Sequence, residues 1–182
     1  MYNTTIEMID TLRTMLETMG IQADEYTDTQ LASIIQQSCT LIGEEYTTPR
    51  SEVDYDYDFK GDLYLTAEYP ILPLGLEVYV DERDITSSIK SITNEGVIHL
   101  EEEHSGVLRV NYNVGLASDV VQEYILLAAM YLTADNSHKG NISSIQEGDV
   151  NISYNTAGNT YNSLDSVIRG IHGLFGARVK LI

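Results

Sequence analysis

The spacing of apolar residues changes along the chain, and each change marks a different kind of predicted element. Residues 1–48 repeat apolar side chains at helical spacing, residues 49–115 alternate them as strands do, and helical spacing returns from Asp119. The sequence therefore predicts an α+β fold in which an antiparallel β-hairpin region is inserted into a small helical domain. The helical part comprises two N-terminal helices, a long apolar third helix and a short C-terminal helix.

Local signals place the ends of the first two helices. A capping box of Thr4 and Glu7 is expected to start the first helix, and Gly20 is expected to end it. The second helix is predicted to begin near Thr27, with Gln30 three residues later. Because the apolar positions of each helix form one stripe, each helix is expected to bury one side only.

Turn residues separate the short alternating runs of residues 49–115. This pattern predicts antiparallel hairpins, because parallel strands need long crossover connections. The most apolar stretch, residues 120–132, predicts the third helix, and a strand at 149–154 and a short helix at 164–174 follow. We expect residues 1–182 to form a single domain, whose parts are the N-terminal helices (1–48), the β region (49–115), a helix–strand–helix segment (116–173) and a C-terminal tail (174–182).

The net charge excludes one class of function. With 28 acidic and 10 basic side chains, the chain carries a formal charge of −18. A protein whose main task is to grip nucleic-acid phosphates needs an excess of Lys and Arg, so this class is excluded. The charge is uneven, because residues 161–182 have one acid and three bases, a net of +2, which leaves −20 on the residues before them. We expect the two ends to meet different surroundings.

Cysteine content and hydropathy set the broad class of protein. Cys39 is the only cysteine in the sequence, which rules out an internal disulfide and an all-cysteine metal site. No apolar run approaches the ~20 residues that span a membrane, and residues 1–5 lack the basic start of a secretory signal. The sequence therefore predicts a soluble, acidic globular protein that is made inside the cell and does not associate with a membrane.

One acidic segment has the spacing that begins a calcium-binding EF-hand loop. Its acids stand at positions 1, 3, 5 and 9 of such a loop and are Asp54, Asp56, Asp58 and Asp62. The loop also needs a glycine at position 6 and a glutamate at position 12, where this chain has Phe59 and Leu65. We therefore favour an extended segment whose aspartates face water, while Tyr55, Tyr57 and Phe59 pack on a neighbouring segment or on another chain.

No catalytic or cofactor-binding arrangement is recognised, so we expect no enzyme activity, no cofactor and no metal. Glu101, Glu102 and Glu103 fall at a predicted hairpin end, where a solvated tip is more common than a glycosidase pair. Cys39 lacks the base and the electropositive surroundings of a catalytic thiol. Helical zinc-site spacing is absent among His99, His104, His138 and His172.

The aromatic composition leaves an alternative function open. The chain has 13 tyrosines and no tryptophan. Tyrosine-rich loops bind sugars or proteins through their amphipathic rings, although tyrosine is also an ordinary strand former. The alternative is therefore a tyrosine-rich module that binds carbohydrate or protein.

Two segments resemble the head–tail connector (adaptor) proteins of long-tailed bacteriophages. In residues 108–132 a strand ending in Tyr112-Asn113-Val114-Gly115 leads through a short polar link into an apolar helix, as in that family. Residues 144–154 look like the family's glycine-containing segment and the strand after it. The opening helices, the hairpins and the final short helix also follow the family's order, so the resemblance covers nearly the whole chain in layout.

The resemblance implies a structural role in the virion, at the head–tail interface, for a protein made in the host cytoplasm. Family members form an oligomeric ring, usually of twelve copies, that joins the portal protein to the next connector or tail protein. The resemblance also implies that the C-terminal tail docks on the portal, and its apolar, mildly basic character suits a partner surface. The docking residues would be Leu174, Phe175, Arg178, Val179, Lys180, Leu181 and Ile182.

A ring of this kind would give the acidity a use. The family's ring continues the DNA channel, and carboxylates facing that channel would repel DNA phosphates, so the duplex would pass without specific binding. The candidate channel-lining acids are Asp54, Asp56, Asp58, Glu101, Glu102 and Glu103.

Overall fold

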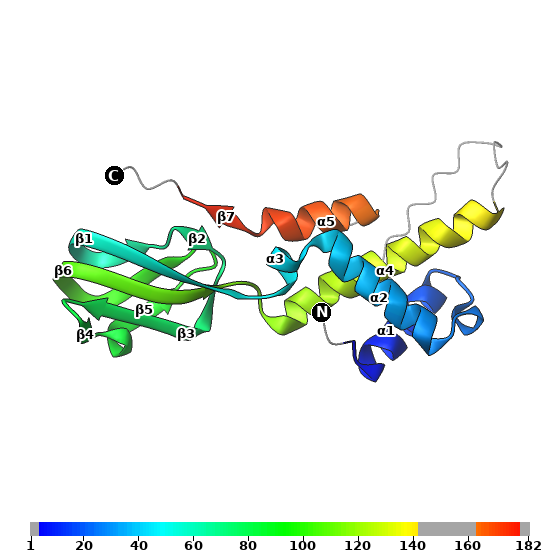
Figure 1. Cartoon of the computed structure of the whole chain (residues 1–182), viewed down its shortest axis with the longest axis horizontal. Helices are drawn as coiled ribbons and strands as arrows, with labels where there is room; N and C mark the ends of the chain where they lie inside the picture. The colour runs from blue at the N-terminus through cyan, green and yellow to red at the C-terminus, as the bar shows by residue number, and fades with distance from the viewer. Residues whose placement is uncertain (1–3, 142–162, 179–182) are drawn as a thin grey trace. The chain divides into compact units, whose positions relative to one another are not determined.

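The protein is described by a computed structural model that covers residues 4–141 and 163–178 (Figure 1). Two compact units divide the chain, Met1–Glu44 with Ser118–His172 and Glu45–Ala117 with Gly173–Ile182. We call the first the helix-containing unit and the second the sheet unit. The described α-helices are α1 (Ile6–Thr18), α2 (Asp28–Ile42), α3 (Glu44–Thr47), α4 (Ser118–Asn141) and α5 (Leu164–Gly173).

Side-chain caps start the first two helices. Thr5 caps α1, because its hydroxyl accepts a hydrogen bond from the Met8 N–H (3.3 Å), so the predicted cap is displaced by one residue from Thr4. At α2 the predicted capping box is confirmed: the Thr27 N–H donates to Gln30 Oε1 (2.8 Å), and the Gln30 N–H donates to the Thr27 hydroxyl (3.3 Å). Each helix buries one stripe, as predicted.

α4 and α5 complete the helix-containing unit. α4 packs against both α1 and α2. α5 buries Val167 and Ile171, and the ring Nε2 of His172 lies 2.7 Å from the carbonyl oxygen of Ile42 at the end of α2. The predicted strand at 149–154 lies outside the described residues.

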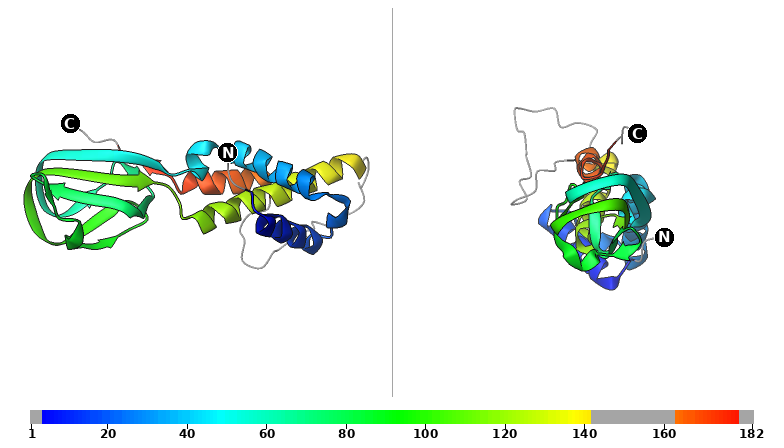
Figure 2. Two further views of the ribbon diagram at one scale, coloured as in Figure 1. Left: turned by 60° about the horizontal axis from the view of Figure 1, so that its bottom comes forward. Right: turned by 90° about the vertical axis from the view of Figure 1, so that its left-hand side faces the viewer.

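The sheet unit contains a five-stranded antiparallel sheet with β6 at its centre. β6 pairs with β1 along nearly its whole length and with β3 and β5 on its other side (Figure 2). β2 and β7 form a separate two-stranded pair. The strands are β1 (Arg50–Leu65), β2 (Glu68–Tyr69), β3 (Ile71–Val80), β4 (Arg83–Asp84), β5 (Ile89–Ile92), β6 (Val97–Val114) and β7 (Gly176–Ala177).

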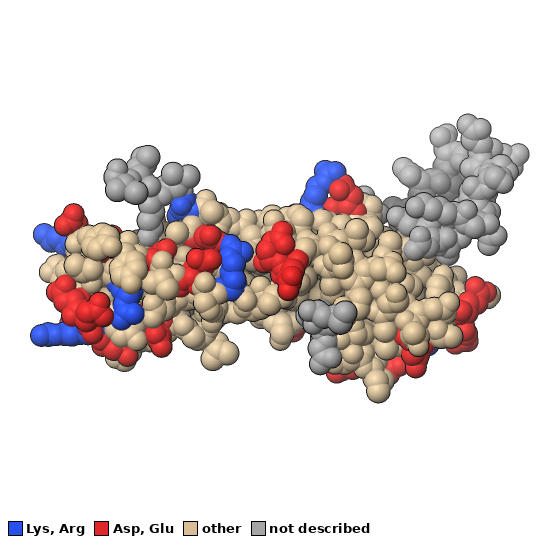
Figure 3. Space-filling view, in the orientation of Figure 1, with Lys and Arg blue, Asp and Glu red and all other residues tan. Residues whose placement is uncertain are grey.

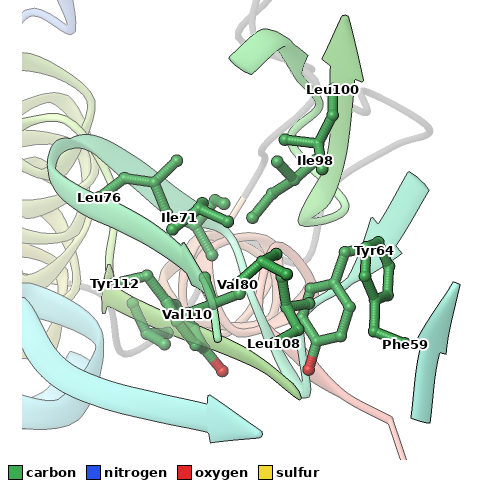
Figure 4. Close-up of a cluster of buried hydrophobic side chains, with 12 residues drawn as sticks. Phe59, Tyr64, Ile71, Leu76, Val80, Ile98, Leu100, Leu108, Val110 and Tyr112 are labelled. Atoms are coloured by element: carbon green, nitrogen blue, oxygen red, sulfur yellow. The ribbon is translucent and has the colours of Figure 1, made fainter. Parts of the chain in front are cut away.

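A core of buried side chains lies within this sheet (Figure 4). Its members come from β1, β3 and β6, and register shifts in β1 and β3 change which alternate positions of those strands point into it. They are Phe59, Tyr64, Ile71, Leu76, Val78, Val80, Ile98, Leu100, Leu108, Val110, Tyr112 and Val114.

The chain is α+β, but the predicted architecture is wrong. The β region is not a set of hairpins inserted into a small helical domain, because its five-stranded sheet holds a core of its own. The predicted long apolar helix is also not seen. α4 is a 24-residue helix, and the buried side chains described in it lie between Val121 and Ala134 only. Alternating residues on strands of 16 and 18 residues supply enough apolar surface for a separate core, which short hairpins would not.

Candidate functional site

A buried carboxylate, Asp54 of β1, lies at the edge of the sheet core. Its side chain accepts hydrogen bonds from the Tyr64 hydroxyl (3.3 Å) and from the Ala67 N–H (2.7 Å). The Tyr112 hydroxyl also bonds to Asp54 and in turn accepts from the Glu68 N–H (3.3 Å). The cluster therefore joins β1 and β6 to the chain segment between β1 and β3.

Burial, and then the charge of Asp54, raise the pKa of Tyr64 and of Tyr112 well above the ordinary value of 10. Both hydroxyls thus keep their protons throughout the neutral range and act as donors to the carboxylate. A carboxylate that receives several donors is stabilised without a cation. The arrangement suits a structural role, since a general acid or base works best with a pKa near the working pH.

The Asp54 cluster supports a short corner of the chain, residues 66–69, which we call the corner. Thr66 fixes it from the other side, because its hydroxyl donates to the carbonyl oxygens of Glu68 (2.8 Å) and Gly96 (3.0 Å). Glycine is needed at position 96, where φ is +70° and a Cβ would overlap the Thr66 hydroxyl. The corner is therefore held by bonds within the sheet unit.

The C-terminal strand β7 docks on this corner. Tyr69 pairs with Gly176 in β2–β7, and the Arg178 N–H donates to the Ala67 carbonyl oxygen (2.6 Å). The Arg178 guanidinium donates through Nη1 to the Thr66 carbonyl oxygen (2.8 Å) and through Nη2 to that of Glu95. A planar guanidinium presents its N–H donors in a rigid fork that fits two carbonyl groups, a fixed geometry that the flexible ammonium of a lysine lacks.

Tyr69 is held by two residues of the same C-terminal segment. The guanidinium carbon of Arg178 lies 4.8 Å from the centre of the Tyr69 ring, a cation–π distance. The backbone of Gly176 also lies against this ring, so that a Cβ at position 176 would overlap it. We call Gly176–Arg178 on Tyr69 and the corner the clasp.

The predicted docking tail is thus partly engaged with its own sheet unit. Phe175 packs edge-on against Tyr46, with ring centres 5.1 Å apart, and against the sheet core. Arg178 makes the clasp, and Leu174 is exposed. The remaining predicted docking residues, Val179, Lys180, Leu181 and Ile182, lie outside the described residues.

The predicted channel acids divide into two groups. Asp54 is buried, with 9% of its surface exposed, and its carboxylate is occupied by hydrogen bonds. Asp58 and Asp62 of β1 are exposed and Asp56 is half-buried. Glu101, Glu102 and Glu103 are exposed too, although they lie within β6 and not at a hairpin end.

The exposed acids of β1 and β6 lie on two strands that pair with each other. Gly61 of β1 pairs with His104 of β6, and Leu63 pairs with His99. Asp62 therefore lies beside residues 101–103, whereas Asp56 stands opposite Leu108, and we call residues 56–62 and 101–103 the acidic stretch. It holds six acids and one base, Lys60, which gives it a net charge of −5. In Figure 3 acidic side chains are prominent on the sheet.

The calcium-like spacing does not form a loop. Asp54, Asp56, Asp58 and Asp62 all belong to the extended strand β1, and Asp54 is buried while Asp58 and Asp62 are exposed. No group of three or more metal-ligating side chains is found among the described residues.

An aromatic surface occupies the outer side of the sheet. The rings of Tyr55 and Tyr57 stack with centres 6.0 Å apart and planes 11° apart, and both are exposed. Arg109 of β6 pairs with Tyr55 and lies over the Tyr79 ring, 4.1 Å from its centre. Arg109 also pairs with Glu82 (3.0 Å). Of the two predicted alternatives for Tyr55 and Tyr57, packing on a neighbouring segment of the chain is wrong, since both are exposed, whereas Phe59 is buried as predicted.

The remaining predicted candidates carry no reactive arrangement among the described residues. Cys39 is buried in α2, and burial raises the pKa of its thiol to about 11, which keeps it protonated. His99 lies in a strand as predicted, but His104 lies in β6 instead of a loop.

A groove of about 490 Å³ is lined by residues of α1 and α4. It combines the apolar side chains of Met15, Leu126 and Leu127 with three acids, Glu7, Asp119 and Glu123. These acids form no ion pair within the described residues, and we assign the groove no function.

Sequence reasoning missed both the Asp54 cluster and the clasp. The partners of Asp54 come from positions 64, 67 and 112, and those of Arg178 from positions 66, 67, 69 and 95. No local spacing connects such positions. The one sequence feature that could have pointed to the clasp is Gly176 two residues before Arg178, a spacing that is common in proteins for other reasons.

No helix of the described residues is both long enough and apolar enough to span a membrane.

Comparison with known proteins identifies no relative of this chain. No protein-family model matches the sequence, and no curated protein matches it significantly.

Proposed function

We propose that this chain is a structural virion protein, a head–tail connector that forms a ring under the portal and continues the DNA channel. The observation that supports it best is the acidic stretch. Two sets of acids about 45 positions apart in the sequence, residues 56–62 and 101–103, lie on the paired strands β1 and β6, with Asp62 beside residues 101–103. Repeated around a ring, such a stretch would form a band of negative charge.

The acidic stretch suits a surface that DNA passes without binding. Its carboxylates are mostly exposed, and Lys60 is its only base. Repulsion between carboxylates and phosphates acts over about 8 Å at physiological ionic strength, so the band would keep the duplex centred in a channel. The candidate channel acids of this proposal are Asp56, Asp58 and Glu101–Glu103, since Asp54 is buried.

The C-terminal residues serve as the portal-docking segment in this proposal. Arg178, held on the corner, fixes the point from which the sequence Val179-Lys180-Leu181-Ile182 continues. Apolar side chains around a single lysine suit a partner groove with acidic edges. The partners are the portal protein on one side and the next connector or tail protein on the other.

Particle imaging tests the assembly. The purified chain, alone and mixed with the portal protein of the same genome, is examined by electron microscopy and mass measurement. We expect closed rings with a central hole, in numbers that rise when the portal is present. Monomers alone at every concentration, with and without the portal, would contradict the proposal.

Charge reversal tests the role of the acidic stretch. We expect the triple variant Glu101→Lys, Glu102→Lys, Glu103→Lys to gain salt-sensitive binding to double-stranded DNA, which the unchanged chain lacks. The matched control reverses three exposed acids of the helix-containing unit, by Glu17→Lys, Asp24→Lys and Glu25→Lys, and should gain far less. Equal gains in both variants, measured by fluorescence anisotropy, would show that only net charge matters.

A second candidate function has one observation in its favour. The stacked, exposed Tyr55 and Tyr57 beside Arg109 have the composition of a binding surface for carbohydrate or protein. A stable monomer whose glycan or protein binding is abolished by Tyr57→Ala would favour this binding module over the connector.

A further inference from the structure

The corner binds a short extended segment of the chain itself, Gly176-Ala177-Arg178. Backbone carbonyl groups of Thr66, Ala67 and Glu95 accept from Arg178, and the Tyr69 ring is covered by Arg178 and by Gly176. The middle residue, Ala177, pairs through its backbone with Glu68. The site therefore selects for glycine at the first position and arginine at the third.

We propose that in the assembled ring this site is filled by Gly176–Arg178 of a neighbouring copy, so that C-terminal strands are exchanged from copy to copy. The inference rests on the ring assembly of the proposed function. It assigns the second copy as the occupant, because every copy carries the matching Gly-x-Arg segment and every copy presents the site.

The connection before β7 favours exchange. α5 ends at Gly173 and β7 begins at Gly176, so only Leu174 and Phe175 lie between them. Two residues span at most about 7 Å, so this connection is a short hinge. Short hinge loops promote the exchange of a terminal element between identical copies.

The site keeps its shape without its occupant. The Asp54 carboxylate accepts a hydrogen bond from the Ala67 N–H, and the Tyr112 hydroxyl accepts one from the Glu68 N–H. The Thr66 hydroxyl donates to the Gly96 carbonyl oxygen. None of these bonds involves the C-terminal segment. An emptied corner is therefore a preformed site, and binding a neighbour's strand needs little reorganisation.

Exchange also conserves the contacts that the clasp makes. β7 pairs over two residues only, so opening it within one chain breaks few bonds. The same bonds form again on the neighbouring copy, so the remaining free-energy cost is that of bringing two copies together. Ring closure offsets this cost, because it raises the effective concentration of each strand near its site. A head-to-tail exchange around a closed ring leaves no corner empty and no strand free.

Disulfide trapping between two variants, each with one introduced cysteine, tests the exchange. Glu68 and Ala177 are directly paired in β2–β7, so cysteines at these positions lie within disulfide range. A Glu68→Cys chain and a longer, tagged Ala177→Cys chain are mixed with the portal, oxidised and separated on a non-reducing gel. Because each chain has one of the two cysteines, only exchange joins them.

The control mixture replaces Glu68→Cys with Glu77→Cys, an exposed position on β3 that pairs with Asn111. We expect on the order of tenfold more heterodisulfide from the paired positions than from the control, since paired strands have millimolar effective concentrations. Arg178→Lys in the tagged chain should lower this excess. Cys39 stays in all variants and is buried.

The same samples are imaged, so the two proposals fail separately. Rings without excess heterodisulfide, together with an intrachain disulfide in the Glu68→Cys/Ala177→Cys chain, would overturn the exchange and leave the connector standing. Excess heterodisulfide in dimers without rings would support the exchange and count against the connector. Neither rings nor heterodisulfide would overturn both.

Discussion

The guanidinium carbon of Arg178 lies 4.8 Å from the centre of the Tyr69 ring, while the same guanidinium bonds to the carbonyl oxygens of Thr66 and Glu95. One side chain thus joins the C-terminal segment to the corner and to the turn before β6. The contact combines cation–π attraction with charge-assisted hydrogen bonds, which are stronger than neutral ones. The order of the C-terminal segment should therefore depend on Arg178 more than on either residue of β7.

Arg178→Ala should loosen β7 and lower the free energy of unfolding of the sheet unit by about 1–2 kcal/mol. Hydrogen exchange at the backbone amides of Gly176–Arg178 is the direct measurement, and protection there should be lost first. Arg169→Ala is the control, because Arg169 is exposed and pairs only with Asp165 of the same helix. It should cost less than about 0.5 kcal/mol. Unchanged protection in Arg178→Ala would rule out the clasp.

Asp54→Ala should destabilise the sheet unit by about 2–3 kcal/mol, because it leaves the Tyr64 hydroxyl and the Ala67 N–H buried without their acceptor. Urea unfolding followed by circular dichroism measures the loss. Asp58→Ala, on the same strand but exposed, should change stability by less than about 0.5 kcal/mol. Equal losses of stability in the two variants would show that Asp54 stabilises the sheet unit no more than an exposed carboxylate of the same strand.

Stability should fall steeply at alkaline pH. The folded chain raises the pKa of Tyr64 and of Tyr112 above 10, so the unfolded chain releases these protons at a lower pH than the folded chain. The stability gained from both tyrosines is fully present below about pH 10 and is lost as the pH rises further, by about 1.4 kcal/mol per pH unit for each. Unfolding in urea at pH 9, 10 and 11 would reveal the slope.

The Tyr112→Phe variant is the control for this slope. It should be less stable at neutral pH, yet lose stability more slowly above pH 10, because one of the two buried hydroxyls is gone. A slope identical to that of the unchanged chain would mean that Tyr112 titrates normally.

Cys39 should resist alkylation in the folded chain. Burial raises the pKa of its thiol from 9.0 to about 11, which lowers the thiolate fraction near pH 8 on the order of 100-fold, and the closed core blocks reagents further. Iodoacetamide labelling followed by mass spectrometry should be slow in buffer and fast in urea. Rapid labelling of the folded chain would show that α2 opens away from its core.

The helix starts were readable from the sequence, because caps are local. Thr27 and Gln30 make the capping box that their spacing predicted, and the shift from Thr4 to Thr5 is within ordinary uncertainty at helix ends. The architecture was not readable, because it depends on strand length. Turn-like residues within 49–115, such as those around Ser105, lie inside β6 and extend it to 18 residues.

The inward face of β1 could not be deduced from alternation alone. Alternating aspartate and tyrosine fixes two faces but not which one is buried, and hydrophobicity favoured the tyrosines. In the fold Asp54 points inward because Tyr64 and Tyr112 supply donors from distant positions. A register shift between Asp56 and Phe59 then exchanges the even-numbered for the odd-numbered positions on the inward face, so that Phe59 points inward as well.

The pairing of Arg50 with Val114 has a mechanical consequence. The first and last residues of the β1–β6 pair stand opposite each other, at the end where the chain enters and leaves this pair. A pulling force applied through these two residues would load one inter-strand bond at a time, because antiparallel bonds run perpendicular to the strands. The long ribbon would then unzip at low force from this end, whereas tension applied along the strands from opposite ends would shear many bonds together.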